Sequence, residues 1–113
     1  MATFVEVMEK YDKAFDKMGE KYDKDLLTAV AKGLGPSIYN SDSSKIAASD
    51  KKEVERIKTN FLIKKLGLSE SDDLDGGIDA VMEKVGRSNP NKQRPVVYYL
   101  LVKHFGKEDV YAK

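Results

Sequence analysis

Apolar residues recur every three or four positions along most of the chain, and this period predicts amphipathic helices packed on one core. The first stripe predicts a helix over 4–18, with Gly19 as its C-terminal cap because glycine accepts the left-handed conformation. A second, shorter helix has Asp23 or Asp25 as its N-terminal cap and ends at Gly33. The residues expected to face the core in these two helices are Phe4, Met8, Tyr11, Phe15, Met18, Leu26, Leu27, Val30 and Ala31.

The chain changes character after the second helix. Gly35 and Pro36 form a turn signal, and serine, asparagine and aspartate dominate residues 37–49. We expect an ordered loop there, with one short helical turn at 45–48. The residues expected to pin this loop to the core are Ile38, Tyr39 and Ile46.

The third helix has the clearest pattern. A serine or aspartate at 49–50 caps it, Glu53 completes a capping box, and Gly67 ends it. A fourth helix is expected over 77–85, ending at Gly86. The buried stripes of the two helices comprise Val54, Ile57, Phe61, Leu62, Leu66, Ile78, Val81, Met82 and Val85.

The last segment is ambiguous, because Val96–Val102 is apolar and rich in β-branched and aromatic residues, as in a buried strand. No other segment alternates with period two, so a strand here would have no sheet to join. We therefore favour a helix from near Asn91 to Phe105, with Pro95 in its first turn. A helix that is apolar on nearly every side belongs at the centre of a bundle or in a subunit interface. The interface candidates are Tyr98, Tyr99, Leu101 and Val102.

These elements predict an all-α fold, a compact bundle of about five short helices in a single domain over 1–113. The composition agrees, because 113 residues with 41% apolar and 35% charged side chains suit one globular domain. The absence of cysteine excludes disulfides, thiolate zinc sites and cysteine nucleophiles. No apolar run is long enough to span a bilayer, and the N-terminus lacks a secretory pattern, so we expect a cytoplasmic location.

Charge is segregated along the chain, although the formal net charge is only +1. Residues 69–83 contain six acidic and no basic side chains, whereas residues 84–107 contain six basic and no acidic ones. The favoured interpretation is that these blocks neutralise each other in the fold or across a dimer, and complement helix dipoles. The alternative is a basic face that binds anions or nucleic acid. Its candidate contact residues are Lys64, Lys65, Arg87, Lys92, Arg94 and Lys103.

The acidic stretch 71–79 has part of the spacing of an EF-hand calcium loop. Two positions oppose that interpretation, because Ser71 stands first and Met82 stands where the loop needs a glutamate. Glu83 comes one residue late, which rotates its carboxylate by about 100° around a helix. We expect a carboxylate-rich helix start and no metal site.

Catalytic signals are weak. The glycine-rich segment 32–37 lacks the Gly-Lys-Ser/Thr ending of a phosphate loop and follows a helix, so it fits a helix cap and turn. His104, the single histidine, lies near a helix end, where it is a favourable dipole partner. We therefore expect no catalytic residue and no cofactor.

Three segments, Ala31–Asn40, Asn60–Leu68 and Tyr98–Lys107, together resemble the DUF2853 family of small bacterial proteins of unknown function. The likeness covers nearly the whole chain. It implies bacterial origin and a compact multihelical fold that is compatible with dimers, and it brings no assigned activity or catalytic residue. The acidic stretch 73–77 is not part of the family pattern.

The leading functional hypothesis is a non-enzymatic helical module that binds another protein, or itself as a homodimer through the last helix. One alternative is nucleic-acid binding through the basic face. Another is a small-ligand carrier or an enzyme that uses the loop Gly33–Asn40 and His104. No membrane partner is expected.

Overall fold

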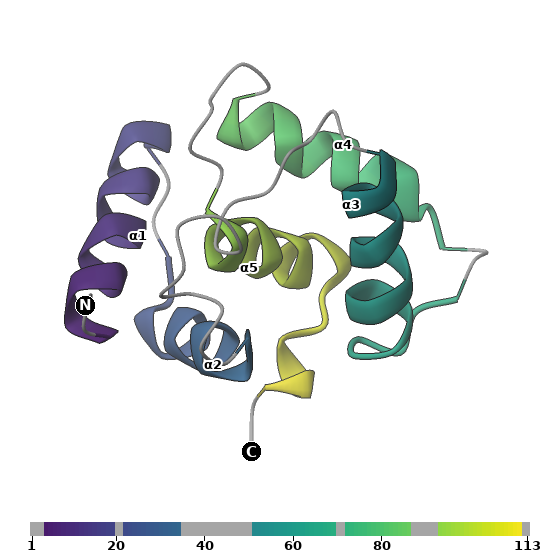
Figure 1. The fold of residues 1–113 in the computed structure, drawn as a ribbon, viewed down its shortest axis with the longest axis horizontal. Helices are drawn as coiled ribbons and strands as arrows, with labels where there is room; N and C mark the ends of the chain where they lie inside the picture. Colours follow the sequence, from purple (N-terminus) through teal and green to yellow (C-terminus); the bar gives the residue numbers. More distant parts are fainter. Residues whose placement is uncertain (1–3, 20–21, 35–50, 70–71, 87–92, 112–113) are drawn as a thin grey trace.

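The chain folds into helices that surround a central one (Figure 1). The computed structural model describes residues 4–19, 22–34, 51–69, 72–86 and 93–111. These residues contain five α-helices and no β-strand, so the all-α prediction is confirmed. The loop expected at 37–49, with its helical turn, lies outside the described residues.

The first helix follows the predicted stripe. Helix α1 (Phe4–Met18) has the predicted bounds and buries Val7, Met8, Tyr11 and Phe15. Gly19 follows with φ 69°, in the left-handed region where a side chain would add strain. The C-terminal boundary is therefore fixed by a glycine, as expected.

Helix α2 (Lys24–Leu34) is capped by Asp23 rather than Asp25. The Asp23 carboxylate accepts hydrogen bonds from the backbone N–H groups of Asp25 (3.0 Å) and Leu26 (3.3 Å). The predicted core residues Leu26, Leu27, Val30 and Ala31 are all buried. The helix continues one residue beyond the predicted end at Gly33.

Aromatic rings join α1 and α2 to the last helix. Phe15 stacks on Tyr22 with centroids 4.5 Å apart and meets the edge of Tyr99 at 5.1 Å. The Tyr99 hydroxyl accepts a hydrogen bond from the Asp23 backbone N–H at 2.7 Å. The Tyr22 hydroxyl donates one to the Asp12 carboxylate at 2.6 Å. This cluster fixes the corner between the first two helices.

The third predicted helix is not one regular α-helix. Helix α3 (Lys51–Arg56) passes into the π-helical segment η2 (Ile57–Ile63). At its end the N–H of Lys64 donates to the Thr59 carbonyl at 3.2 Å, and the N–H of Leu66 donates to the Phe61 carbonyl at 2.9 Å, each a span of five residues. This wider turn lets residues five apart, such as Phe61 and Leu66, both face the core. Gly67 then turns the chain with φ 73°, as predicted.

Helix α4 (Leu74–Val85) begins three residues earlier than predicted. The reason is Asp73, whose carboxylate caps the helix by accepting from the Gly76 backbone N–H at 3.1 Å. The glycine pair therefore lies inside the first turn. Gly77 is buried, and a Cβ there would lie 2.3 Å from the Phe105 ring, so α4 approaches the last helix closely at this point.

Helix α5 (Arg94–Phe105) is the centre of the fold, with α1 and α2 on one side and α3 and α4 on the other (Figure 1). The helical interpretation of Val96–Val102 is confirmed, and Gly106 ends the helix with φ 66°. Residues 95–102 are all buried, against α1, α2, α4 and the ring of Phe61, which stacks on Tyr98 at 4.0 Å. A short 3₁₀ turn, η3 (Glu108–Val110), follows.

The burial of α5 corrects one premise of the dimer hypothesis. Tyr98 and Tyr99 are 7% and 3% exposed, and Leu101 and Val102 are fully covered within one chain. Of the two positions that the sequence allows for this helix, the structure shows the centre of the bundle. The four side chains pack inward from different sides of the helix, so they present no apolar patch to a second copy.

No helix in the described part of the chain combines the length and apolar character that crossing a bilayer requires.

Candidate functional site

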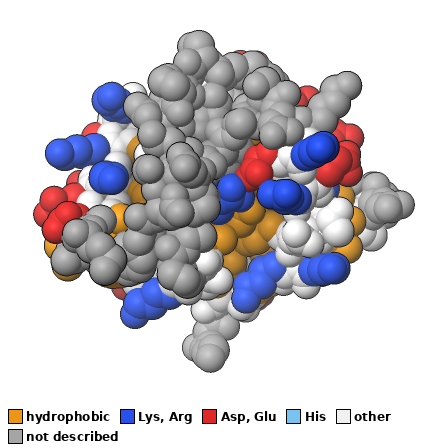
Figure 2. Space-filling view, viewed as in Figure 1, with side chains coloured by type: hydrophobic (Ala, Val, Ile, Leu, Met, Phe, Trp, Pro, Cys, Tyr) orange, Lys and Arg blue, Asp and Glu red, His pale blue; other side chains and the backbone are white. Residues whose placement is uncertain are grey.

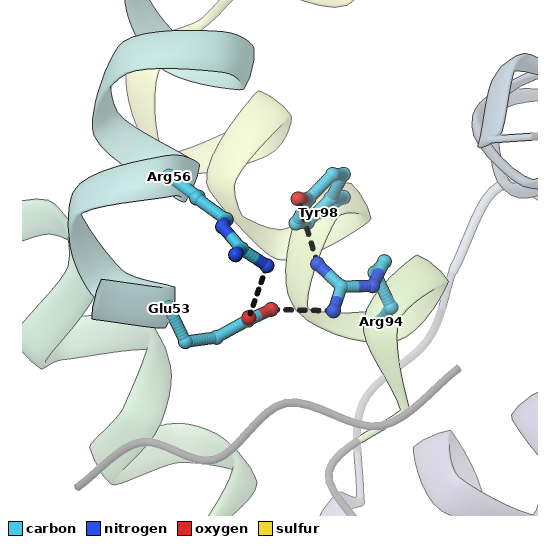
Figure 3. Close-up of polar contacts among 4 residues, drawn as sticks. All are labelled: Glu53, Arg56, Arg94 and Tyr98. Atoms are coloured by element: carbon cyan, nitrogen blue, oxygen red, sulfur yellow. Dashed lines mark hydrogen bonds and ion pairs between the residues drawn. The ribbon is translucent and has the colours of Figure 1, made fainter. Parts of the chain in front are cut away.

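A polar network links α3 to the start of α5 (Figure 3). The Arg94 guanidinium donates one hydrogen bond to the Glu53 carboxylate and another, 3.1 Å long, to the Tyr98 hydroxyl. The second Glu53 oxygen lies 4.0 Å from the guanidinium of Arg56. The side chains of Arg94 and Glu53 are only 16% and 13% exposed, so their ion pair is largely withdrawn from water.

The electrostatics of this network keep Arg94 and Tyr98 in their ordinary charge states. Burial lowers the pKa of Arg94, but the Tyr98 hydroxyl and the Glu53 carboxylate outweigh burial and hold that pKa above its usual value. Burial raises the pKa of Tyr98, and the nearby guanidinium offsets only part of the rise. Neither group is poised to exchange a proton near neutral pH, so we interpret the network as a structural link.

Four lysines line a cleft where α1, the end of α4 and the start of α5 meet. We call it the lysine cleft, and its volume is about 480 Å³. The remaining lining residues are apolar except for the amide of Gln93, and no described acidic side chain lines the cleft. The lysines are Lys10, Lys13, Lys17 and Lys84, and the apolar residues are Ala14, Met18, Val85 and Val96.

Helical spacing explains how three of these lysines come together. Lys10, Lys13 and Lys17 follow one another at intervals of three and four, which places them on one side of α1. None of the three forms an ion pair with another described residue. A like-charge pair such as Lys13 and Lys17 destabilises an isolated helix by about 0.2–0.5 kcal/mol. Figure 2 shows basic side chains gathered over α1, at the left of the view.

A second, smaller cleft lies between α4 and α5. We call it the histidine cleft, and its volume is about 280 Å³. Lys84 lines both clefts, so the two adjoin at that side chain. Lys103 and His104 line it from α5, both exposed, and the Lys103 ammonium lies 3.8 Å from the Glu108 carboxylate. The other lining residues are Ala80, Val81, Tyr99 and Leu100.

The described members of the predicted basic face have different surroundings. Arg94 is held in the network with Glu53, whereas Lys103 lines the histidine cleft. Lys64 is exposed after η2, and the Lys65 ammonium lies 5.2 Å from the centre of the Tyr111 ring. Arg87 and Lys92 lie outside the described residues. Nucleic-acid contact through this set of six stays a prediction.

The acidic stretch has structural partners where the structure describes it. Asp72 accepts hydrogen bonds from the backbone and hydroxyl of Ser69 at 2.8 and 3.3 Å. Asp73 caps α4, and Asp75 pairs with Lys58 at 3.0 Å. Lys58 also pairs with Glu55 at 3.0 Å, and this contact and the one to Asp75 raise the pKa of Lys58. No group of three or more metal-binding side chains occurs among the described residues.

Sequence reasoning missed two features of these sites. The capping box predicted for Glu53 involves residues 49–50, which lie outside the described residues, and the sequence gives no sign that the Glu53 carboxylate binds Arg94, forty-one residues away. The lysines of α1 were not singled out, although their spacing beside Ala14 and Met18 is a signal for a basic edge along an apolar strip. Only the fold shows that this edge faces Lys84.

Comparison with known proteins places the chain in a family. Residues 9–109 match the model of the family described as "Protein of unknown function (DUF2853)". The chain belongs to this family. The resemblance seen in the three sequence segments is thereby confirmed, and the DUF2853 match covers most of the chain, from within α1 to η3. A search of the curated proteins found no match.

Proposed function

We propose that this DUF2853 protein is a non-enzymatic interaction module whose lysine cleft binds an acidic helical segment of a partner protein. The observation that carries the proposal is the convergence of four lysines on a cleft whose other lining is mainly apolar. Charged rims around an apolar centre are typical of protein interfaces, where burial supplies affinity and charge supplies specificity.

The lining favours a protein segment over nucleic acid. Single-stranded nucleic acid is bound by basic grooves with aromatic side chains on which bases stack. No aromatic side chain is among the described residues that line the lysine cleft, whereas Met18, Val85 and Val96 are. An amphipathic helix with an apolar side chain flanked by glutamates matches both parts of this lining.

The cleft is also a better place for a partner than the apolar side chains of α5. Those side chains are covered within one chain, and exposing them would unfold the core. The lysines of α1, in contrast, are exposed already, so binding needs no rearrangement of the helices.

The test uses a fluorescent peptide of about 15 residues, with leucines at helical spacing flanked by glutamates. We expect Lys13→Glu/Lys17→Glu to weaken its binding by about tenfold or more, because two attractions become repulsions. The matched control, Lys64→Glu/Lys65→Glu, changes net charge equally outside the cleft and should retain binding. Circular dichroism checks that all variants are folded.

Two outcomes would contradict the proposal. Equal loss of binding in both double variants would show attraction to overall charge rather than to the cleft. Tighter, Lys64-dependent binding of a single-stranded oligonucleotide would favour the nucleic-acid alternative. A peptide with the leucines replaced by glutamines separates the apolar contribution from the electrostatic one.

A further inference from the structure

The two clefts adjoin at Lys84, which lines both, so a single bound segment can contact the two of them. Val96 lines the lysine cleft and Lys103 lines the histidine cleft, seven residues further along α5. At 1.5 Å per residue, these positions are about 10 Å apart along the helix axis. A segment held in the lysine cleft therefore reaches the histidine cleft within about two turns of its own helix.

The histidine cleft brings together three nitrogen donors from two helices. Lys84 comes from α4, and Lys103 and His104 come from α5. A lysine ammonium is a donor only, and an imidazole carries at least one N–H in either protonation state. No acidic side chain is among the described residues that line the cleft. The Lys103 contact to Glu108, at 3.8 Å and partly exposed, is weak enough for a bound anion to replace it.

The walls of the histidine cleft strengthen its attraction for an anion. Val81, Tyr99 and Leu100 are 3%, 3% and 6% exposed, so the packed core lies directly behind that side of the cleft. Electrostatic attraction is larger beside such low-dielectric walls than in open solvent. The close packing of α4 on α5 at Gly77, against Phe105 and His104, holds the two sides of the cleft together.

We infer that the histidine cleft binds a phosphoryl group on the acidic segment, so that the partner is recognised when a serine or threonine is phosphorylated. A phosphoryl group supplies three acceptor oxygens and nearly two negative charges, matching three donors and two lysines. A carboxylate brings a single negative charge, so it balances only one of the two lysines. This inference rests on the proposed function, because the lysine cleft holds the rest of the segment.

The experiment compares three versions of the acidic peptide, with serine, glutamate or phosphoserine about seven residues from the anchoring leucine. In the wild-type protein we expect phosphoserine to bind about tenfold more tightly than serine, and glutamate to fall between them. The double variant Lys103→Gln/His104→Gln should lose this gain while still binding the serine peptide. The matched control, Lys107→Gln, should keep the gain because Lys107 follows α5 and does not line the cleft.

The other possible results contradict either the phosphoryl inference or the proposed function. Equal affinities for the serine and phosphoserine peptides would overturn the inference, as would a gain that survives Lys103→Gln/His104→Gln. Equal affinities for the glutamate and phosphoserine peptides would show that the cleft binds a carboxylate as well as a phosphoryl group, which contradicts the inferred preference for phosphate. Failure of every peptide to bind through Lys13 and Lys17 would refute the proposed function itself, and the inference with it. Competition by inorganic phosphate checks that the gain comes from the phosphoryl group.

Discussion

The ion pair between Glu53 and Arg94 is the contact at which a single atom change should have a large effect. Glu53→Gln keeps the shape of the side chain but removes the carboxylate charge that faces the Arg94 guanidinium in a site only 13–16% exposed. Because removing one partner of a buried pair destabilises a fold strongly, we expect a loss of about 3 kcal/mol. Urea unfolding measures this loss as a lower midpoint.

A paired replacement distinguishes the cost of the orphaned charge from the loss of the link itself. Glu53→Met/Arg94→Met removes both charges and retains apolar bulk, so it should recover much of the lost stability. The Tyr98 hydroxyl still loses its donor, which costs about 1 kcal/mol. A Glu53→Gln protein as stable as the wild type would show that water screens the pair.

Tyr22 gives the fold a dependence on alkaline pH. Its hydroxyl donates to Asp12, and this hydrogen bond is the main reason that its pKa rises from 10.0 to about 12. Since the folded state favours the protonated phenol, the stabilising contribution is complete below about pH 10 and is lost as pH rises through about 12. Asp12→Asn should return the Tyr22 titration toward 10, as followed by tyrosinate absorbance.

Tyr111 needs separate treatment in this measurement, because burial raises its pKa to about 12 as well. Tyr111→Phe removes that titration, and Tyr98, whose pKa is also raised, contributes alike with and without Asp12→Asn, so the difference between the curves shows the effect of Asp12. If Asp12→Asn then leaves the tyrosinate curve unchanged, the hydrogen bond does not control the pKa of Tyr22.

Among the elements, α4 and α5 make the contact most sensitive to added volume. In Gly77→Ala, the new Cβ would meet the Phe105 ring at 2.3 Å and His104 at 3.1 Å. Overpacking costs about 1–3 kcal/mol, which exceeds the gain of about 0.5–1 kcal/mol from replacing a helical glycine. We expect a net loss of stability in urea, relieved by Phe105→Leu.

Gly33→Ala is the matched control for that substitution. Its Cβ would lie 3.6 Å from Tyr111, an ordinary contact, inside the last turn of α2. We expect a gain of up to about 0.5–1 kcal/mol, since alanine loses less backbone freedom on folding. Destabilisation by both substitutions would show that the close approach at Gly77 is not what decides the outcome.

The helices were predictable because their signals are local. In α1 the apolar residues recur every three or four positions and Gly19 follows directly, so a short stretch of sequence shows both the helix and the residue that ends it. The π-helical segment Ile57–Ile63 was not predictable from the sequence, because its wider turn depends on which side chains pack into the core. The early start of α4 had a local signal in Asp73, which caps one turn before the glycine pair.

The candidate site was much less predictable than the helices. Each basic residue is visible in the sequence, but Lys17 and Lys84 meet only because α1 and α4 both pack on α5. Arg94 is predicted to belong to a basic face, but its charge is paired with Glu53 in the interior, which the sequence does not indicate. Helix periodicity fixes which residues share a face, and it leaves the pairing of faces open.

For the whole molecule, the burial of α5 within one chain predicts that the chain folds without a partner. We expect the urea midpoint to stay constant when protein concentration is varied over about two orders of magnitude, since mass action affects only coupled association. A midpoint that rises with concentration would show that a dimer contributes to stability, and would require an interface away from Tyr98, Tyr99, Leu101 and Val102.

The same helix has a consequence once the protein is heated. Val96–Val102 joins seven uncharged residues without proline, five of them valine or tyrosine with high β propensity, and this composition favours intermolecular cross-β pairing when the segment is exposed. In the native state its neighbours cover it on every side. Thermally opened chains should therefore aggregate through this segment before they can refold, so the temperature at which helical structure is lost will depend on the rate of heating.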